Sequence, residues 1–191
     1  MPSTCVLTVG STRFDPLVAS FLDPTSLSSL SSLGIQHVLA QVGNSSLPEG
    51  WKEGTRMTEQ GLQVEVVRFL GDLEERVGRA DLVVSHAGAG SILSFLRPLN
   101  SSSPSSSAER TRRQLVLIPN STLMDSHQSD LADEMEKKGW AVVCRRPEDL
   151  PATLKQLASR AEQQGEMPAP DYPELYKGRM QRIIDETLGY V

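Results

Sequence analysis

The sequence predicts an α/β domain in which a doubly wound, mostly parallel sheet is covered by helices on both faces. Two observations predict it. Short apolar runs alternate along the chain with segments of helical periodicity, and these runs are apolar almost throughout rather than at every second residue. Strands that are buried on both faces have that composition. With 191 residues, 38% of them hydrophobic, a single domain covering residues 1–191 is expected to bury a sizeable core.

Each expected strand is an apolar run that ends at a glycine or a polar residue. The first run reads CVLTVGS and ends in a glycine turn, whereas the third alternates before it becomes apolar. In chain order, strands are expected at Cys5–Ser11, Ile35–Gly43, Leu62–Leu70, Asp81–His86, Gln114–Asn120 and Trp140–Arg145.

The expected helices fill intervals between these strands, at residues 14–22, 72–80, 91–96 and 127–139. The third helix ends before Pro98, because proline lacks the N–H that a helix interior needs. In the fourth, Leu131, Ala132 and Met135 share one face, and a glycine follows the last turn, as is typical of helix ends. The interval 43–61 is rich in glycine, proline and polar residues, which predicts a long loop or weak structure.

Two further segments lie outside this alternation. Residues 100–113 are rich in serine and have little to bury, so they are expected to form a disordered surface insertion. Residues 173–191 place apolar side chains at helical spacing, which predicts an amphipathic C-terminal helix. That helix either packs on its own sheet or docks on another chain.

Composition and charge exclude several classes of function. Lys plus Arg number 19 and Asp plus Glu 24, and no basic stripe stands out, so nucleic acid is not an expected ligand. No apolar run approaches the ~20 residues that span a bilayer, and no signal peptide is evident. We therefore expect a cytosolic protein without a membrane span. Cys5 and Cys144 lie in apolar runs and are expected to be buried free thiols.

The stretch VVSHAGAGSIL places Gly88, Ala89, Gly90 and Ser91 where the fourth strand gives way to a helix. Ligands of doubly wound sheets bind beyond the carboxyl ends of the strands. A helix N-terminus there offers free N–H groups and partial positive charge, which suits a phosphate or diphosphate. The motif is neither a P-loop nor a dinucleotide fingerprint, and tight packing of the turn alone would also explain its glycines.

A second polar cluster follows the next strand. Asn120 ends that strand, and His127 and Gln128 begin the next helix. Side chains of these types can hydrogen-bond the ribose, phosphate or sugar of a nucleotide. Asp125 with Gln128 also fits a capping box, so the pair has a purely structural explanation as well.

Three segments, TVGSTRFDPLV, DLVVSHAGAGSIL and PNSTLMDSHQSDLADEMEKKGW, together resemble the donor-binding half of GT-B glycosyltransferases of the family 28 type. The resemblance implies a single Rossmann-like half-domain. It also implies that Phe69 and Leu70 read the uracil edge, that the turn from Gly88 to Ser91 holds the diphosphate, and that Asn120, His127 and Gln128 hold the ribose, phosphate and donor sugar.

The resemblance also implies roles for the remaining candidate residues. Gly10, Ser11 and Thr12 would line the interdomain side of the cleft. Family members carry an acidic residue where this chain has Ser94, so that ribose contact is missing. His86 is the only candidate for a general base, and it also fits a role in shaping the turn. No Asp-x-Asp run is present to hold a metal, and no cofactor is expected.

A GT-B enzyme needs two such halves, so the resemblance implies a membrane-anchored, acceptor-binding partner subunit. The implied reaction moves GlcNAc from UDP-GlcNAc onto GlcNAc-diphosphodolichol, with inversion, at the cytosolic face of the endoplasmic reticulum. The C-terminal helix would then contact the partner. Two alternatives stay open: a non-catalytic nucleotide-binding module, and a hydrolase that uses Ser85 or Ser91 with His127.

Overall fold

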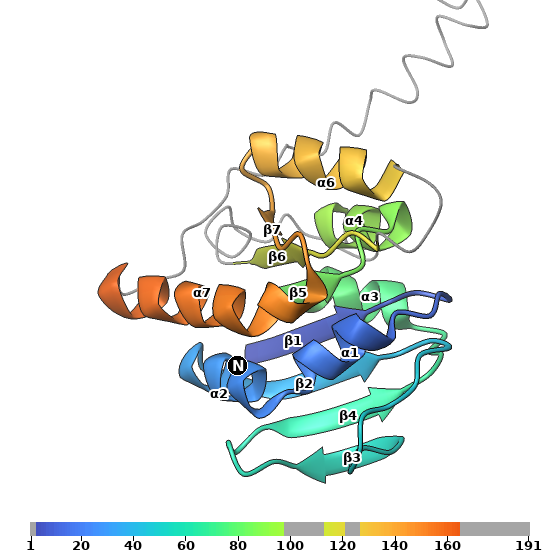
Figure 1. Cartoon of the computed structure of the whole chain (residues 1–191), viewed down its shortest axis with the longest axis vertical. Coiled ribbons are helices and arrows are strands. Elements are labelled where there is room, and N and C mark those ends of the chain that lie inside the picture. Colours follow the sequence, from blue (N-terminus) through green and yellow to red (C-terminus); the bar gives the residue numbers. More distant parts are fainter. Residues whose placement is uncertain (1–2, 98–112, 121–126, 165–191) are drawn as a thin grey trace, which may run out of the picture.

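The computed structural model describes residues 3–97, 113–120 and 127–164. Within these ranges, one sheet has the strand order β3-β4-β2-β1-β5-β6-β7 (Figure 1). Its strands are β1 (Ser3–Thr8), β2 (Ile35–Gln41), β3 (Gly54–Met57), β4 (Gln63–Val67), β5 (Leu82–Ser85), β6 (Gln114–Leu117) and β7 (Val142–Val143). The helices are α1 (Asp15–Phe21), α2 (Pro24–Ser32), α3 (Leu73–Arg79), α4 (Ala89–Leu96), α6 (His127–Lys137) and α7 (Leu150–Gln164), with a 3-10 turn η1 (Pro147–Asp149) before α7.

The sheet is parallel except at one edge, where β3 runs antiparallel to β4. The chain starts in the centre at β1, builds outward through β2 and β4, and returns to the centre at β5 before continuing to β6 and β7. This is the strand order of the Rossmann fold, and its direction reverses between β1 and β5. The predicted fold class is confirmed.

Two apolar layers cover the sheet because neighbouring residues of a strand point to opposite faces. On one face, Leu7 and Val84 pack with α1, α2 and α7, the helices drawn in front of the strands in Figure 1. On the other face, Val6 and Val83 pack with α3, α4 and α6. Both faces of the central strands are therefore dry, which explains why the sequence reads as unbroken apolar runs.

Some elements differ from the sequence-based expectation. The interval 43–61 contains β3, whose residues are all exposed and pair with β4 through the backbone, so no apolar pattern marks it. The helix α2 begins at Pro24 with Asp23 as N-cap, whose carboxylate accepts from the amide of Thr25 at 2.8 Å. Beyond β7, η1 and α7 extend the domain past Arg146.

The serine-rich segment up to residue 112 and the expected helix at 173–191 lie outside the described residues. Arg113, the last residue of the expected disordered insertion, is described and firmly held. Its guanidinium donates to the carbonyls of Val77, Ala80 and Phe95 at 2.9–3.0 Å and lies 4.2 Å from the centre of the Phe95 ring. Arg113 thereby ties β6 to the ends of α3 and α4.

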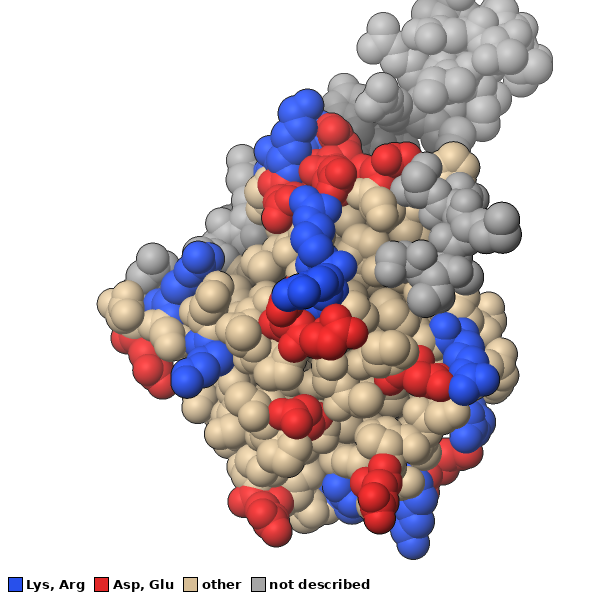
Figure 2. All heavy atoms as spheres, viewed as in Figure 1, with Lys and Arg blue, Asp and Glu red and all other residues tan. Residues whose placement is uncertain are grey.

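Both cysteines are free and buried, as predicted, and burial is the main reason that their pKa values are raised. In the part of the chain that the structure describes, no helix is long and apolar enough to cross a membrane. On the face shown in Figure 2, acidic and basic side chains are interspersed. Local ion pairs, such as Arg146–Asp149 at 2.8 Å and Lys138–Glu134 at 3.1 Å, join some of the charged side chains of the domain.

Candidate functional site

The candidate site lies where the strand order reverses, at the carboxyl ends of β1 and β5. These strands are in register, with Thr8 opposite Ser85. The chain then leaves β1 for α1 on one face and leaves β5 for α4 on the other. Connections that diverge in this way open a crevice at the edge of a doubly wound sheet. The expected site residues Gly10 and Gly88 lie in the two connections.

The helix α4 begins with exposed, uncapped amides. Gly88 is its N-cap residue and makes no side-chain cap. Within the described ranges, the amides of Ala89, Gly90 and Ser91 have no acceptor outside the helix, and Ala89 and Gly90 are exposed. The first N–H groups of a helix have no intrahelical partner and carry partial positive charge. Amides of this kind are suited to an anion, and the binding of a diphosphate by this turn stays a prediction.

His86 forms the inner wall of the turn. Its side chain is buried, and its Nδ1 lies 3.2 Å from the carbonyl oxygen of Thr8. Because a carbonyl only accepts, Nδ1 carries the proton and Nε2 keeps its lone pair. Burial lowers the pKa of His86, so the ring is neutral near pH 7. A neutral ring held at Nδ1 is suited to shaping the turn.

The imidazole of His86 leaves little room for a Cβ at Gly88 and at Gly10, which explains why both positions are glycine. A Cβ on Gly88 would lie 2.4 Å from Nε2 and 2.6 Å from Cε1 of the ring, and a Cβ on Gly10 would lie 3.2 Å from Cε1. Gly10 also has a φ of 62°, and so does Ala87, which precedes Gly88. By contrast, a Cβ on Gly90 would meet nothing within 4 Å.

Ser94 forms a hydrogen bond within α4. Its hydroxyl donates to the carbonyl of Gly90 at 2.9 Å, on its own helix. Ser85 is fully buried, and among the described residues its hydroxyl oxygen has no hydrogen-bond partner. A serine without a base cannot be an activated nucleophile, so the hydrolase hypothesis fails for Ser85.

The loop from Gly10 to Thr12 is fixed against the loop that follows β2. The Thr12 hydroxyl donates to the Val9 carbonyl at 2.7 Å, and the Asn44 side chain donates to the Ser11 carbonyl at 2.9 Å. Gly43 allows this contact, because a Cβ there would lie 2.6 Å from the Gly10 oxygen. Ser11 is exposed and Thr12 is partly exposed, so both are available at the edge of the crevice.

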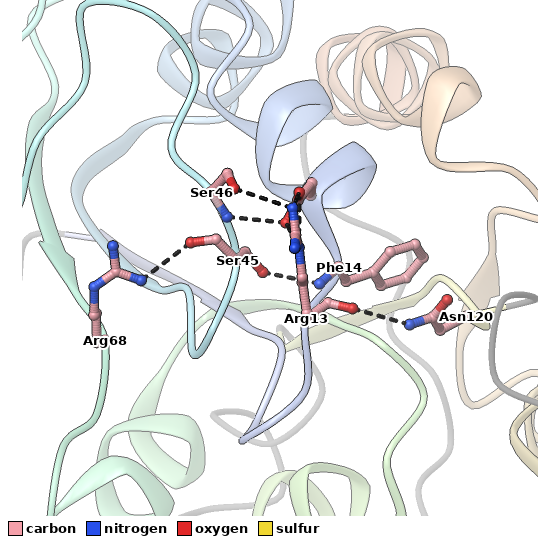
Figure 3. A network of polar contacts seen from close by, with 7 residues as sticks. Arg13, Phe14, Ser45, Ser46, Arg68 and Asn120 are labelled. Carbon is pink, nitrogen blue, oxygen red and sulfur yellow. Dashed lines mark hydrogen bonds and ion pairs between the residues drawn. The ribbon is translucent and has the colours of Figure 1, made fainter.

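Beyond this loop, the start of α1 is filled by the chain's own side chains (Figure 3). Arg13 pairs with Asp15 at 2.6 Å, and the Asp15 carboxylate accepts from the amide of Ser46 at 2.9 Å. The hydrogen bond from Arg13 is the main cause of the lowered pKa of Asp15. The buried hydroxyl of Ser45 accepts from the amide of Phe14 at 2.9 Å.

Asn120 and Gln128 meet, as the sequence suggested, and they join the loop before α1. The amide of Asn120 donates to the side-chain oxygen of Gln128 at 3.1 Å, and the Asn120 side chain donates to the Arg13 carbonyl at 3.4 Å (Figure 3). Asn120 is buried, Gln128 is partly exposed, and His127 is exposed at the start of α6. Asp125, the other half of the expected capping box, lies outside the described residues.

Phe69 and Leu70 follow β4, two strands away from β1 in the sheet. Phe69 is 59% exposed, and Leu70 packs into the apolar layer that contains Phe95 of α4. The backbone between β4 and α3 therefore reaches the face on which α4 lies. The structure brings these residues to the same edge of the sheet as the glycine turn.

Sequence reasoning missed Gln41, the last residue of β2. Its fully buried side chain bonds Thr8, Gly10 and the carbonyl of Arg68, and so connects the ends of β1, β2 and β4. The signal was available: a glutamine inside the apolar run IQHVLAQVG needs buried partners, because an unpaired amide in a core is costly.

One hollow of the surface, of about 560 Å³, lies elsewhere, between α1, α2 and the β3 edge, and contains Leu27, Trp51 and Met57. None of the expected site residues lines it. Among the described residues, no group of three His, Cys, Asp or Glu side chains is arranged to hold a metal ion.

Comparisons with known proteins agree with this geometry. The model of the glycosyltransferase family 28 C-terminal domain matches residues 4–98, from β1 to the end of α4. The UDP-N-acetylglucosamine transferase subunit ALG13 of Cryptococcus neoformans is 35% identical over 212 residues, covering 99% of this chain and 98% of the relative. The protein of the same name from Homo sapiens is 34% identical over 158 residues, covering 81% of this chain and 12% of the relative.

Solved structures agree on the fold. The NMR solution structure of ALG13 superposes with a TM-score of 0.58 at 22% identity, covering 98% of this chain and 97% of that one. MurG of Acinetobacter baumannii superposes with a TM-score of 0.54 at 18% identity, covering 85% of this chain and 42% of MurG. The fold is thus that of one half of a GT-B glycosyltransferase.

Proposed function

Since the chain belongs to the family of UDP-N-acetylglucosamine transferase subunits called ALG13, we propose that it is the donor-binding, catalytic subunit of a transferase that takes GlcNAc from UDP-GlcNAc. The acceptor is GlcNAc-diphosphodolichol, so the reaction is the second step in the assembly of the lipid-linked oligosaccharide for N-glycosylation. A membrane-anchored partner subunit binds this acceptor and recruits the chain to the cytosolic face of the endoplasmic reticulum.

The observation that carries the proposal is the open start of α4 at the strand-order reversal. The Gly88 N-cap leaves the amides of Ala89, Gly90 and Ser91 directed away from the helix, where they can hold the donor diphosphate. A helix N-terminus stabilises an anion by about 0.3–1 kcal/mol, and by up to ~2 kcal/mol in partly buried geometries. Direct N–H donation to phosphate oxygens adds to that.

The other donor contacts are assigned from position. The backbone at Phe69 and Leu70 binds the uracil. Asn120, His127 and Gln128 face the ribose, the phosphate and the sugar. The side-chain oxygen of Gln128 accepts from the Asn120 amide, so the NH₂ group of Gln128 is left to donate to the ligand. Gly10, Ser11 and Thr12 form the side of the crevice that faces the partner.

Catalysis follows from charge development on the leaving group. The 4-hydroxyl of the acceptor attacks the anomeric carbon from the face opposite UDP, which inverts the α linkage to β. Negative charge grows on the diphosphate as the bond breaks, and the preorganised amides of α4 stabilise it. The acceptor hydroxyl must lose its proton to a base within hydrogen-bond reach. His86 lies behind the glycine turn, so we assign that base to the partner subunit.

A charge placed in the first turn of α4 tests the proposal. Gly90 is the second residue of α4, is exposed, and has open space around a Cβ, so Gly90→Asp adds a carboxylate without a clash. Thr25 is the exposed second residue of α2, a helix outside the site, and Thr25→Asp is the matched control. Repulsion between charges about 5 Å apart is ~1–3 kcal/mol, which corresponds to about tenfold to a hundredfold weaker UDP binding.

The measurement is transfer of labelled GlcNAc from UDP-GlcNAc to a dolichol-linked GlcNAc, by the full chain co-expressed with the acceptor-binding subunit and by the chain alone. We expect activity from the complex, strong loss with Gly90→Asp, and little change with Thr25→Asp. Wild-type transfer by Gly90→Asp would disprove the phosphate role of α4. UDP binding without any transfer by the complex would instead identify a nucleotide-binding module.

A further inference from the structure

Gln41 is the most heavily bonded side chain near the site. It is 1% exposed and belongs to the last position of β2. Its Oε1 accepts from the Thr8 hydroxyl at 2.7 Å and from the Gly10 amide at 3.1 Å. Its Nε2 donates to the carbonyls of Gly10 at 2.7 Å and Arg68 at 2.6 Å. A primary amide offers two donors and one acceptor oxygen with two lone pairs, so every bonding position of Gln41 is used.

The bonds of Gln41 join the turn after β4, which the proposed function assigns to the uracil, to the end of β1 at Thr8 and Gly10. Arg68 directly precedes Phe69 and Leu70, the backbone assigned to the uracil. The carbonyl of Thr8 accepts from Nδ1 of His86, the inner wall of the diphosphate turn, and a Cβ on Gly10 would lie 3.2 Å from Cε1 of that ring. Gln41 therefore links the base end of the site to its phosphate end indirectly, through Thr8, Gly10 and the ring of His86.

Resting on the proposed function, we infer that Gln41 is a positioning residue that sets the spacing between the uracil-binding turn and the diphosphate-binding turn. Only glutamine meets the requirement. Asparagine is one methylene too short to reach both sides, and ionised glutamate has only acceptor oxygens where Nε2 of Gln41 donates two bonds. An apolar side chain leaves the Gly10 and Arg68 carbonyls without the bonds that Nε2 supplies, and unpaired buried polar groups are costly.

Titration calorimetry of the full chain with UDP, and separately with uridine, tests this spacing role. Because UDP contacts both turns and uridine only one, Gln41→Met should raise the Kd of UDP about tenfold or more, and the Kd of uridine much less. Leu30→Ala is the control. Leu30 is a fully buried residue of α2, so its truncation lowers the stability of the protein without changing either turn. Its Kd values should equal those of the wild type.

Gln41→Glu adds a readout that a merely structural role would not move. A buried carboxylate facing the carbonyls of Gly10 and Arg68 is disfavoured, so its pKa rises. As the pH falls, the protonated carboxyl regains one donor, and UDP affinity should recover toward the wild-type value at the same pH. The nearby charged or titrating groups are His86, beyond Thr8, and the Arg68 guanidinium, which pairs with Glu53 at 2.7 Å. Comparison with the wild type at each pH removes their contribution.

A third readout does not depend on UDP. Nitrogen NMR of His86 should show the Nδ1-protonated ring in the wild type and a changed tautomer population in Gln41→Met, because Gly10 and Thr8 are released. If Gln41→Met binds UDP and uridine as tightly as the wild type, the inference is wrong. If the wild type binds no UDP, the proposed function fails, and an unchanged His86 tautomer would then reject the positioning role by itself.

Discussion

Alanine at Gly88 should destabilise the protein, whereas alanine at Gly90, in the same turn, should stabilise it. The structure gives the reason: a Cβ at position 88 would lie 2.4 Å from Nε2 of His86, whereas a Cβ at position 90 would have no neighbour within 4 Å. The two substitutions have the same chemistry, so their difference isolates the contact with the imidazole.

The magnitude follows from the distances. Non-bonded heavy atoms are optimally about 3.5–4.0 Å apart, so the ring must move by about 1 Å to accept the methyl group. That movement breaks or strains the 3.2 Å contact from Nδ1 to the Thr8 carbonyl, at about 0.5–1.5 kcal/mol. With overpacking of ~1–3 kcal/mol in addition, Gly88→Ala should cost about 1.5–4.5 kcal/mol. Gly90→Ala should gain about 0.5–1 kcal/mol, because glycine inside a helix is unfavourable.

Thermal unfolding measures both effects. At ~2–4 °C per kcal/mol for a protein of this size, Gly88→Ala should lower Tm by roughly 3–18 °C and Gly90→Ala should raise it by roughly 1–4 °C. In a His86→Ala background the cost of Gly88→Ala should shrink by about 1 kcal/mol or more, because contacting residues couple. Equal melting temperatures for the two alanine variants, or an unchanged cost without the imidazole, would refute the reasoning.

Two further predictions concern Arg113 and His86. Arg113→Met should lower the free energy of unfolding by about 2–4 kcal/mol, because backbone carbonyls of Val77, Ala80 and Phe95 lose a charged donor; Arg113→Lys should recover only part of this in urea denaturation, since an ammonium cannot match the guanidinium fork. The pKa of His86 is lowered by burial, so the unfolded chain binds its proton more readily. Its contribution to stability is therefore complete above pH ~6.5 and is lost as the pH falls below that value. A pH series of urea unfolding should show this slope in the wild type and a smaller one in His86→Gln.

The fold could be predicted because its main signal is local. Buried parallel strands such as β1 and β5 appear in the sequence as apolar runs that end at glycine or polar residues. β3 could not be predicted, since all of its residues are exposed and only backbone bonds to β4 hold it. In α2, the serines that weaken the helical pattern include Ser26, whose hydroxyl bonds the Ser20 carbonyl at 2.6 Å. That contact joins α2 to the end of α1, six positions earlier in the chain, and hydrophobic periodicity does not reveal it.

The turns of the candidate site could be predicted from the sequence, but the buried side chain that holds them in place, Gln41, could not. The motif from His86 to Ser91 predicts a glycine turn at the end of a strand. The glycine at position 88 can, however, be explained by the neighbouring imidazole as well as by a ligand. Gln41 has no motif at all. Its role depends on partners 27 to 33 positions away in the sequence, and only strand order and register bring them together.

Two helices, α1 and α4, begin where the strand order reverses, and their first turns differ. At α1, Asp15 supplies a carboxylate to the first turn, Pro16 has no N–H to offer, and the Ser45 hydroxyl occupies the amide of Phe14. At α4, within the described ranges, no side chain caps the first turn. Since both starts carry the same partial positive charge, an incoming anion meets a carboxylate at one and free amides at the other. Under the proposed function, the polar network around Arg13 therefore makes α1 the less favourable of the two helix starts for a diphosphate.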